Sequence, residues 1–224
     1  MPKSKVALSL KECERVEALT IGDGSFSAFT SFEVEGVPLL GELSMGSGCF
    51  RGVSALKLEA LRGLKKVEIG SDSFPSKEGD FSLRNCSALT ELRVGGGSMK
   101  LFRSVAIADV PSLKVIEIGS GCFESVSEFG LIGLSGLERV VIGENSFTKK
   151  KNGFGKESNR RFYVKNCPSL RELRVGCYSF SDYVSAVIEG NDALEVIAMG
   201  ELSSESFNFN SASLKLKSVG WMEC

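Results

Sequence analysis

Cysteine is the residue type in this chain that most readily suggests chemistry, because thiols bind metals and form disulfides. The chain has seven cysteines and no histidine. Cys13, Cys86 and Cys167 occupy equivalent places in a repeat with a period near 24 residues, and Cys49 and Cys122 share another place. Neighbours within each group are three repeats apart, roughly 14 Å in a stack of parallel strands, which is too far for a disulfide. Because there is also no C-x-x-C pair, we predict buried free thiols, no bound metal and a reducing compartment.

The sequence also lacks an activated serine nucleophile, a phosphate-binding loop and an isolated pair of carboxylates. Ser73, Ser146 and Ser179 recur at one turn position, and no histidine is available to activate them. The string GFGKES at 153–158 fails as a phosphate-binding loop, because the earlier glycine is missing and glutamate follows the lysine. The carboxylates fall mainly in exposed repeat positions. The sequence therefore predicts a non-catalytic protein without a cofactor.

The composition favours a folded protein without strong electrostatic steering. The 224 residues are 42% hydrophobic and 25% charged, with a formal net charge of −1, so binding of nucleic acid by the molecule as a whole is not expected. No window of 18 apolar residues could span a bilayer, and the first 16 residues make a poor signal peptide. We expect a cytoplasmic protein, with a cell-surface location as the alternative.

Short apolar segments that end in glycine recur along the whole chain. Successive anchor glycines are separated by 24, 24, 25, 24, 24, 33 and 24 residues; they are Gly22, Gly46, Gly70, Gly95, Gly119, Gly143, Gly176 and Gly200. Leucine or valine lies six residues before each anchor, and phenylalanine lies four residues after most of them, with Met99 once in its place. A fixed period in the twenties indicates a solenoid. We predict one domain, 1–224, of about eight coils, in which each anchor glycine allows a sharp turn.

Each repeat contains two stretches of alternating apolar residues. One precedes the anchor glycine, and a second follows the phenylalanine, as in SFEVEGV at 31–37 and RFYVKNC at 161–167. Alternation of this kind is typical of short β-strands, and helical periodicity is almost absent. One coil cannot enclose its own core, so stacked coils must share it. The pattern predicts an all-β, right-handed parallel β-solenoid with two short strands per coil and little helix.

The segment L-x-x-V-x-I-x-x-N-x-F at 137–147 resembles the conserved segment of leucine-rich repeat proteins. The strings IGDGSF and IGSDSF are similar to those of the irregular, BspA-like subgroup. This resemblance covers nearly the whole chain, and it implies a curved parallel-β solenoid that binds proteins. Only Asn145 matches the family asparagine, and the second half of each repeat has the pattern of a strand rather than a helix; the other residues at the asparagine position are Gly24, Gly48, Asp72, Gly97, Gly121 and Tyr178.

Three consecutive coils form a block that is duplicated. Residues 36–50 resemble 109–123, residues 60–74 resemble 133–147, and residues 84–98 resemble 165–179. Polar insertions follow equivalent coils, as PSKEGD at 75–80 and as the longer TKKKNGFGKESNRR at 148–161. We therefore expect both insertions at one corner of the solenoid, three coils apart.

Two surfaces are candidates for binding a partner. Charges of alternating sign follow the outward strand positions, and Val115 and Val141 interrupt them, so we expect Val115, Arg139 and Val141 to lie side by side, exposed, in a protein-binding footprint. The basic loop 148–161 is the second candidate, for an acidic protein segment, a phosphorylated partner or RNA; its residues of interest are Lys149, Lys150, Lys151, Phe154, Arg160 and Arg161. The alternatives are a self-neutralising charge ladder and a passive insertion.

The first repeat begins in the middle of a coil, with Leu8, Leu10 and Cys13 in the places of a second strand. An open solenoid end invites association, so we expect either an edge-to-edge homodimer through the N-terminal coil or a fragment of a longer repeat protein. The preferred function is a protein-interaction scaffold with a protein partner of unknown identity. The alternative is a surface or secreted adhesion module, and an enzyme is less favoured than either.

Overall fold

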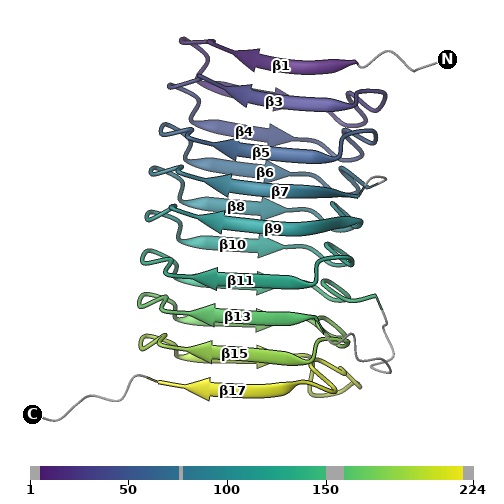
Figure 1. The fold of residues 1–224 in the computed structure, drawn as a ribbon, viewed down its shortest axis with the longest axis vertical. Coiled ribbons are helices and arrows are strands. Elements are labelled where there is room, and N and C mark those ends of the chain that lie inside the picture. The colour runs from purple at the N-terminus through teal and green to yellow at the C-terminus, as the bar shows by residue number, and fades with distance from the viewer. Residues whose placement is uncertain (1–5, 76–77, 150–158, 219–224) are drawn as a thin grey trace, which may run out of the picture.

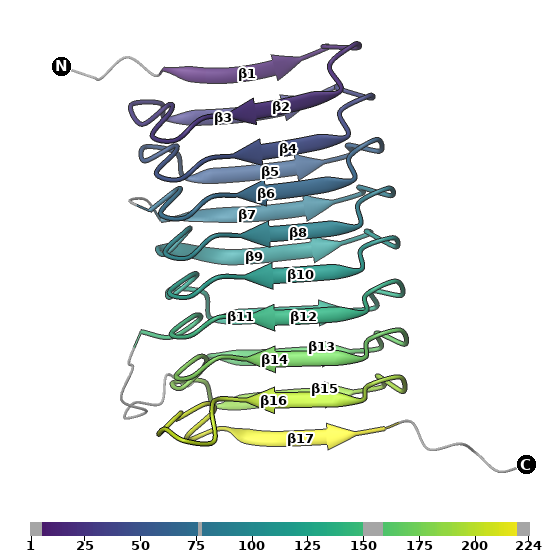
Figure 2. The same cartoon turned by 180° about the vertical axis from the view of Figure 1, so that it is seen from behind.

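The computed structural model describes residues 6–75, 78–149 and 159–218, and the chain forms a right-handed parallel β-solenoid of about eight turns (Figures 1 and 2). The predicted all-β fold with two short strands per coil is therefore confirmed. No helix occurs in these three ranges. Within them, accordingly, no helical segment has the length and hydrophobicity needed to cross a membrane.

The strands alternate between two walls of the solenoid. The even-numbered strands are β2 (Ala18–Ile21), β4 (Glu42–Met45), β6 (Lys66–Ile69), β8 (Glu91–Val94), β10 (Val115–Ile118), β12 (Arg139–Ile142), β14 (Glu172–Val175) and β16 (Val196–Met199). The odd-numbered strands are β1 (Ala7–Lys11), β3 (Ser31–Glu35), β5 (Ala55–Glu59), β7 (Gly79–Arg84), β9 (Phe102–Ala108), β11 (Glu128–Ile132), β13 (Arg161–Lys165), β15 (Ser185–Glu189) and β17 (Ser213–Lys217).

All even strands form one continuous eight-stranded parallel sheet, which we call the even sheet. The odd strands form two parallel sheets, β1-β3-β5-β7-β9 and β11-β13-β15-β17, which together make the odd wall. In the even sheet each strand residue lies beside its repeat equivalent in the next coil, as Val115 beside Arg139 and Ile116 beside Val140. The repeat period of the sequence is thus the hydrogen-bonding register of the solenoid.

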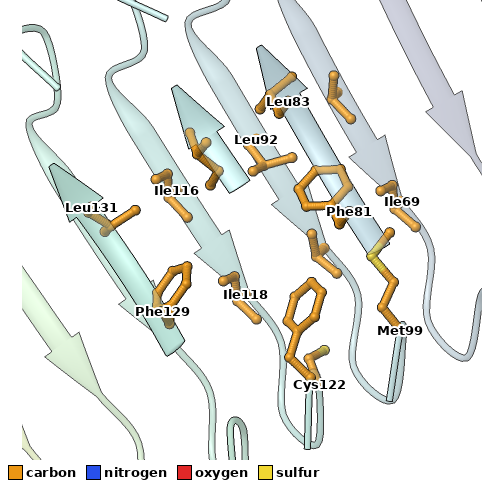
Figure 3. Packing of buried hydrophobic residues seen from close by; sticks show 14 of the residues in the cluster. Ile69, Phe81, Leu83, Leu92, Met99, Ile116, Ile118, Cys122, Phe129 and Leu131 are labelled. Carbon is orange, nitrogen blue, oxygen red and sulfur yellow. The ribbon is translucent and has the colours of Figure 1, made fainter. Parts of the chain in front are cut away.

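The core consists of side chains that point inward from both walls, and it continues from coil to coil. Leu64, Leu113 and Leu137 are completely buried, and the rings of the repeated phenylalanines stack along the axis, with centroids 5.3 Å apart for Phe123 and Phe147. Met99 takes the phenylalanine place in one coil of this column, and Figure 3 shows its side chain near Phe81 and Ile69. Shared burial of this kind stabilises a solenoid whose single coils could not fold alone.

The turn after each even strand explains why asparagine is rare at the family position. Residues in this place have φ between 54° and 72°; they are Gly24, Gly48, Asp72, Gly97, Gly121, Asn145 and Tyr178. Positive φ favours glycine, asparagine and aspartate, so these three residue types satisfy the same backbone requirement. Only Tyr178 departs from that preference. The repeat therefore conserves a left-handed backbone at this point and not one particular side chain.

The anchor glycines do more than permit the predicted turn. The chain turns after them as expected, but among these glycines only Gly200 has positive φ. A Cβ atom on Gly70 would lie 2.4 Å from the carbonyl carbon of Gly46, and one on Gly95 would lie 2.5 Å from the amide nitrogen of Ser71. From Gly46 to Gly176 the anchors are glycine because adjacent coils touch backbone to backbone there.

Serine or cysteine occupies each place in a hydrogen-bonded column just before the phenylalanines and Met99. Ser73 Oγ accepts a bond from the amide of Cys49 (3.1 Å) and donates to the carbonyl of Gly46 (3.0 Å). The Cys122 thiol takes the donor role of the hydroxyl, with Sγ 3.2 Å from the carbonyl oxygen of Gly95. All six cysteines in the described ranges are free, and all but Cys13 are buried, which confirms that part of the thiol prediction.

Replacement of Cys122 by serine should flatten the loss of stability at high pH. Burial raises the pKa of the Cys122 thiol to about 12, so the protonated thiol stabilises the fold below the ordinary thiol pKa, and this contribution disappears as the pH rises toward 12. Serine does not titrate there and fits the same column. Urea melts at about pH 7 and pH 10.5 should differ less for Cys122→Ser than for the wild type, by up to a few kcal/mol. Cys13→Ser is the control, and equal pH dependence in all three proteins would contradict the prediction.

Candidate functional site

The outward face of the even sheet carries a continuous network of ion pairs. Arg93 bonds to Glu91 of its own strand and to Glu117 of the next coil. Arg139 then bonds to the same Glu117 and, at 2.8 Å, to Glu172. The hydrogen bonds from Arg174 and Arg139 hold the pKa of the half-buried Glu172 carboxyl below its usual range. These charges neutralise one another across the coils, as the ladder interpretation expected.

Val115 and Val141 lie within this network, although they do not interrupt it as predicted. Val115 is beside Arg139 in register, and Val141 is beside Glu117, so the Glu117–Arg139 ion pair runs diagonally between the two valines. Both valines are half-buried instead of fully exposed, because the surrounding charged side chains cover part of them. The structure thus places Val115, Arg139 and Val141 together in one patch of apolar and paired charged groups.

A groove of about 960 Å³ runs along the ends of the even strands, and the sequence analysis did not predict it. Its lining includes a row of anchor glycines, outward side chains of the even sheet, and the residues that follow the glycines, as in Gly70, Glu68 and Ser71. We call it the glycine groove. It extends from Thr20 in the first coil to Val141. The signal that could have revealed it is the row of glycines beside a row of outward side chains, because residues without side chains leave a furrow.

The basic loop 148–161 is placed only at its two ends. Lys149 and Arg161 are exposed, and Arg161 begins β13, in register with Glu128. Lys150, Lys151 and Phe154 lie outside the described residues. The two ends therefore remain accessible for the predicted contact, but they make up only part of the predicted set.

Arg160 was predicted to be an exposed member of this loop, and that prediction is wrong. Its side chain is fully buried and donates from Nη1 to Asp182 Oδ2 at 3.2 Å, and its guanidinium carbon lies 4.8 Å from the centre of the Tyr183 ring. Nη2 donates to the carbonyl oxygens of Glu124, Val126 and Phe147 at 2.8, 2.9 and 3.0 Å. A buried guanidinium requires this many acceptors to compensate for its lost hydration.

Asp182 joins the two ends of the insertion. Besides Arg160, it accepts hydrogen bonds from the amide of Lys149 at 3.1 Å and from the hydroxyl of Thr148 at 3.3 Å. The sequence analysis missed this residue. The available signal was FSDY at 180–183, where equivalent coils have FSAF at 26–29 and MKLF at 99–102, so that a carboxylate replaces an apolar side chain.

One group of possible metal ligands occurs in the described part of the chain. Ligand atoms of Glu144, Cys177 and Glu201 all lie within 4.8 Å of one another, in three successive coils. A structural zinc site requires four ligands. This cluster offers three, two of which are exposed carboxylates, so it does not define a metal site.

Comparisons of the chain with protein-family models, curated proteins and solved structures find no match. The fold alone supports the likeness to leucine-rich repeat proteins, and it does so only at the level of a parallel β-solenoid built from repeats. The groove and the ion-paired face are the features from which a function can be argued.

Proposed function

We propose that this chain is a non-catalytic scaffold, of the leucine-rich repeat type and similar to the BspA-like subgroup, that binds a protein partner on the even sheet. The observation that carries the proposal is the adjacency of the half-buried Val115 and Val141 to the glycine groove, on a rigid eight-stranded sheet. Rigid surfaces with partly apolar patches bind proteins at a low cost in conformational entropy.

The charge arrangement favours a protein over a nucleic acid. Every arginine on the central part of this face, Arg93, Arg139 and Arg174, already has a carboxylate partner. To bind phosphates, those arginines would have to give up their carboxylate partners. Nucleic acid would therefore gain less binding affinity here than from unpaired basic groups. The exposed Lys149 and Arg161 leave the basic loop as a second contact, for an acidic protein segment, a phosphorylated partner or RNA.

The free thiols support a reducing compartment, and we propose the cytoplasm, because surface and secreted repeat proteins more often carry disulfides. An edge-to-edge homodimer is also proposed. Within the described ranges β1 and β2 have a paired neighbour on one side only, and their inward residues Leu8, Leu10 and Leu19 are only partly buried.

The double substitution Val115→Lys with Val141→Glu should abolish capture of the partner from a native extract, because it places unpaired charges inside the proposed footprint. The melting temperature should change little, since both side chains reach solvent. The matched control is Ala106→Lys with Val187→Glu, which adds the same charges to half-buried outward positions of the odd wall. Capture that survives in the even-sheet variant, or that is lost equally in both variants, would place the footprint elsewhere.

A further inference from the structure

The odd wall has a seam that the even sheet lacks. Strands β7 and β9 pair over six residues, and β11 and β13 pair over five, but no strand pairing joins β9 to β11 in the described chain. On the opposite wall, β8 and β10 pair over all four residues at the same step. Strand pairing thus joins the two parts of the solenoid on the even sheet only, and at the corner before β11 the Ser125 amide donates to the Lys100 carbonyl (3.4 Å) while Lys100 pairs with Glu124 (3.2 Å).

The turn beside the seam has also lost its hydrogen bond. At intact steps, the amide that follows an odd strand donates to the last carbonyl of the next odd strand, as from Asn85 to Ala108 (3.3 Å) and from Gly133 to Lys165 (2.9 Å). Among the described residues no equivalent bond runs from Asp109 to Ile132. The interruption therefore covers the full width of the odd wall.

A similar loss of strand pairing and of the turn hydrogen bond occurs 73 residues earlier. The loss is therefore a property of the repeated block. Strands β3 and β5 share a single paired position, Val34 with Leu58, and the turn bond that would join Gly36 to Glu59 is also missing from the described chain. Addition of 73 to the residue numbers of these two strands gives the positions of β9 and β11. Both steps therefore join equivalent coils of the duplicated sequence.

Packing explains why β9 lies closer to β7 than to β11. Phe102 at the start of β9 is fully buried and packs on the coil that contains β7. Its ring lies 6.2 Å from that of Phe74 and close to Gly79. Across the seam the outward residues Ala106 and Gly130 offer no hydrogen bond, whereas Ser104 bonds to Asp80 at 2.5 Å on the intact side. On the β11 side of β9, neither strand pairing nor a hydrogen bond between outward side chains is present among the described residues.

We propose that the seam between β9 and β11 is a hinge. The coils up to β9 and the coils from β10 onward move as two rigid stacks about the continuous even sheet, so that the odd wall opens and closes. The glycine groove crosses this step, with Gly70 and Arg93 on one side and Gly119 and Val141 on the other. Bending therefore changes the curvature of the groove. The hinge follows from hydrogen bonding and packing alone and is independent of the proposed function.

Distance measurements between paired spin labels test the hinge directly. One pair, Lys57→Cys with Val187→Cys, lies on the odd wall, and the matched pair, Ser44→Cys with Arg174→Cys, lies on the even sheet in the same two coils. Each pair spans five strand spacings, roughly 24 Å. Both are made in a background with Cys13→Ser and Cys224→Ser, since the other five cysteines are buried.

The distance distribution of the odd-wall pair should be at least twice as broad as that of the even-sheet pair. Equal widths would overturn the proposal, whether both distributions are narrow, as for a rigid rod, or both are broad, as for general flexibility. The thermal melting curve of each labelled protein shows whether it is folded, so a broad distribution cannot be attributed to unfolding.

Discussion

Phe123→Ala should lower the free energy of unfolding by about 3–5 kcal/mol. Phe123 is 1% exposed, stacks on Phe147 at 5.3 Å, and lies in the coil that follows Met99, where the aromatic column is already interrupted. The neighbouring coils cannot close the cavity, because their spacing is set by strand pairing on the even sheet.

Urea melts of Phe123→Ala should also show reduced cooperativity between the two halves of the stack, since this residue bridges them. Phe26→Ala is the matched control. Phe26 has the same place in the first coil but is only partly buried, so its replacement should cost less. A change below about 1 kcal/mol in Phe123→Ala would contradict the packing described.

Asp182→Ala should destabilise the protein by about 3–5 kcal/mol, because it removes the buried carboxylate that pairs with the buried guanidinium of Arg160. It also removes the acceptor of the Lys149 amide and of the Thr148 hydroxyl. Arg160→Gln should be destabilising for the complementary reason, although Arg160 was predicted to be a partner-binding residue of the basic loop.

Denaturant melts of three variants separate the buried pair from the exposed charges. Lys149→Gln changes an exposed side chain, so it should change the free energy of unfolding by less than about 0.5 kcal/mol. The double variant Arg160→Met with Asp182→Leu should recover much of the loss, since apolar groups of similar volume can replace a buried ion pair. If Asp182→Ala is as stable as Lys149→Gln, the pair does not anchor the insertion.

The repetitive part of the fold could be predicted from sequence because each structural environment recurs in up to eight coils. The leucines six residues before the anchors and the phenylalanines four residues after them are buried in coil after coil, so a single atypical residue such as Met99 does not obscure the pattern. The period of the glycines also gives the strand register directly.

Features that arise between coils could not be predicted in the same way. The anchor glycines looked like turn residues, and their role becomes clear only when the backbone of the adjacent coil is in place. The burial of Arg160 depends on Asp182, 22 residues later, and Arg160 lies at the end of an insertion that breaks the repeat spacing. The ion pair between Glu117 and Arg139 is diagonal, so a comparison of residues in register makes the valines look like a gap in the charge ladder.

Hydroxyl-radical footprinting of side chains tests most directly whether the even sheet is the binding face. The chain is labelled once alone and once in complex with the captured partner, and the two modification patterns are compared. Radical modification reports the solvent exposure of individual side chains. Val115 and Val141, which are half-buried on the even sheet, should be modified less in the complex, while the exposed Ile132 and Leu214 on the odd wall should be modified equally in both states. Protection of Ile132 and Leu214 with none at Val115 and Val141 would contradict the proposal that the even sheet binds the partner.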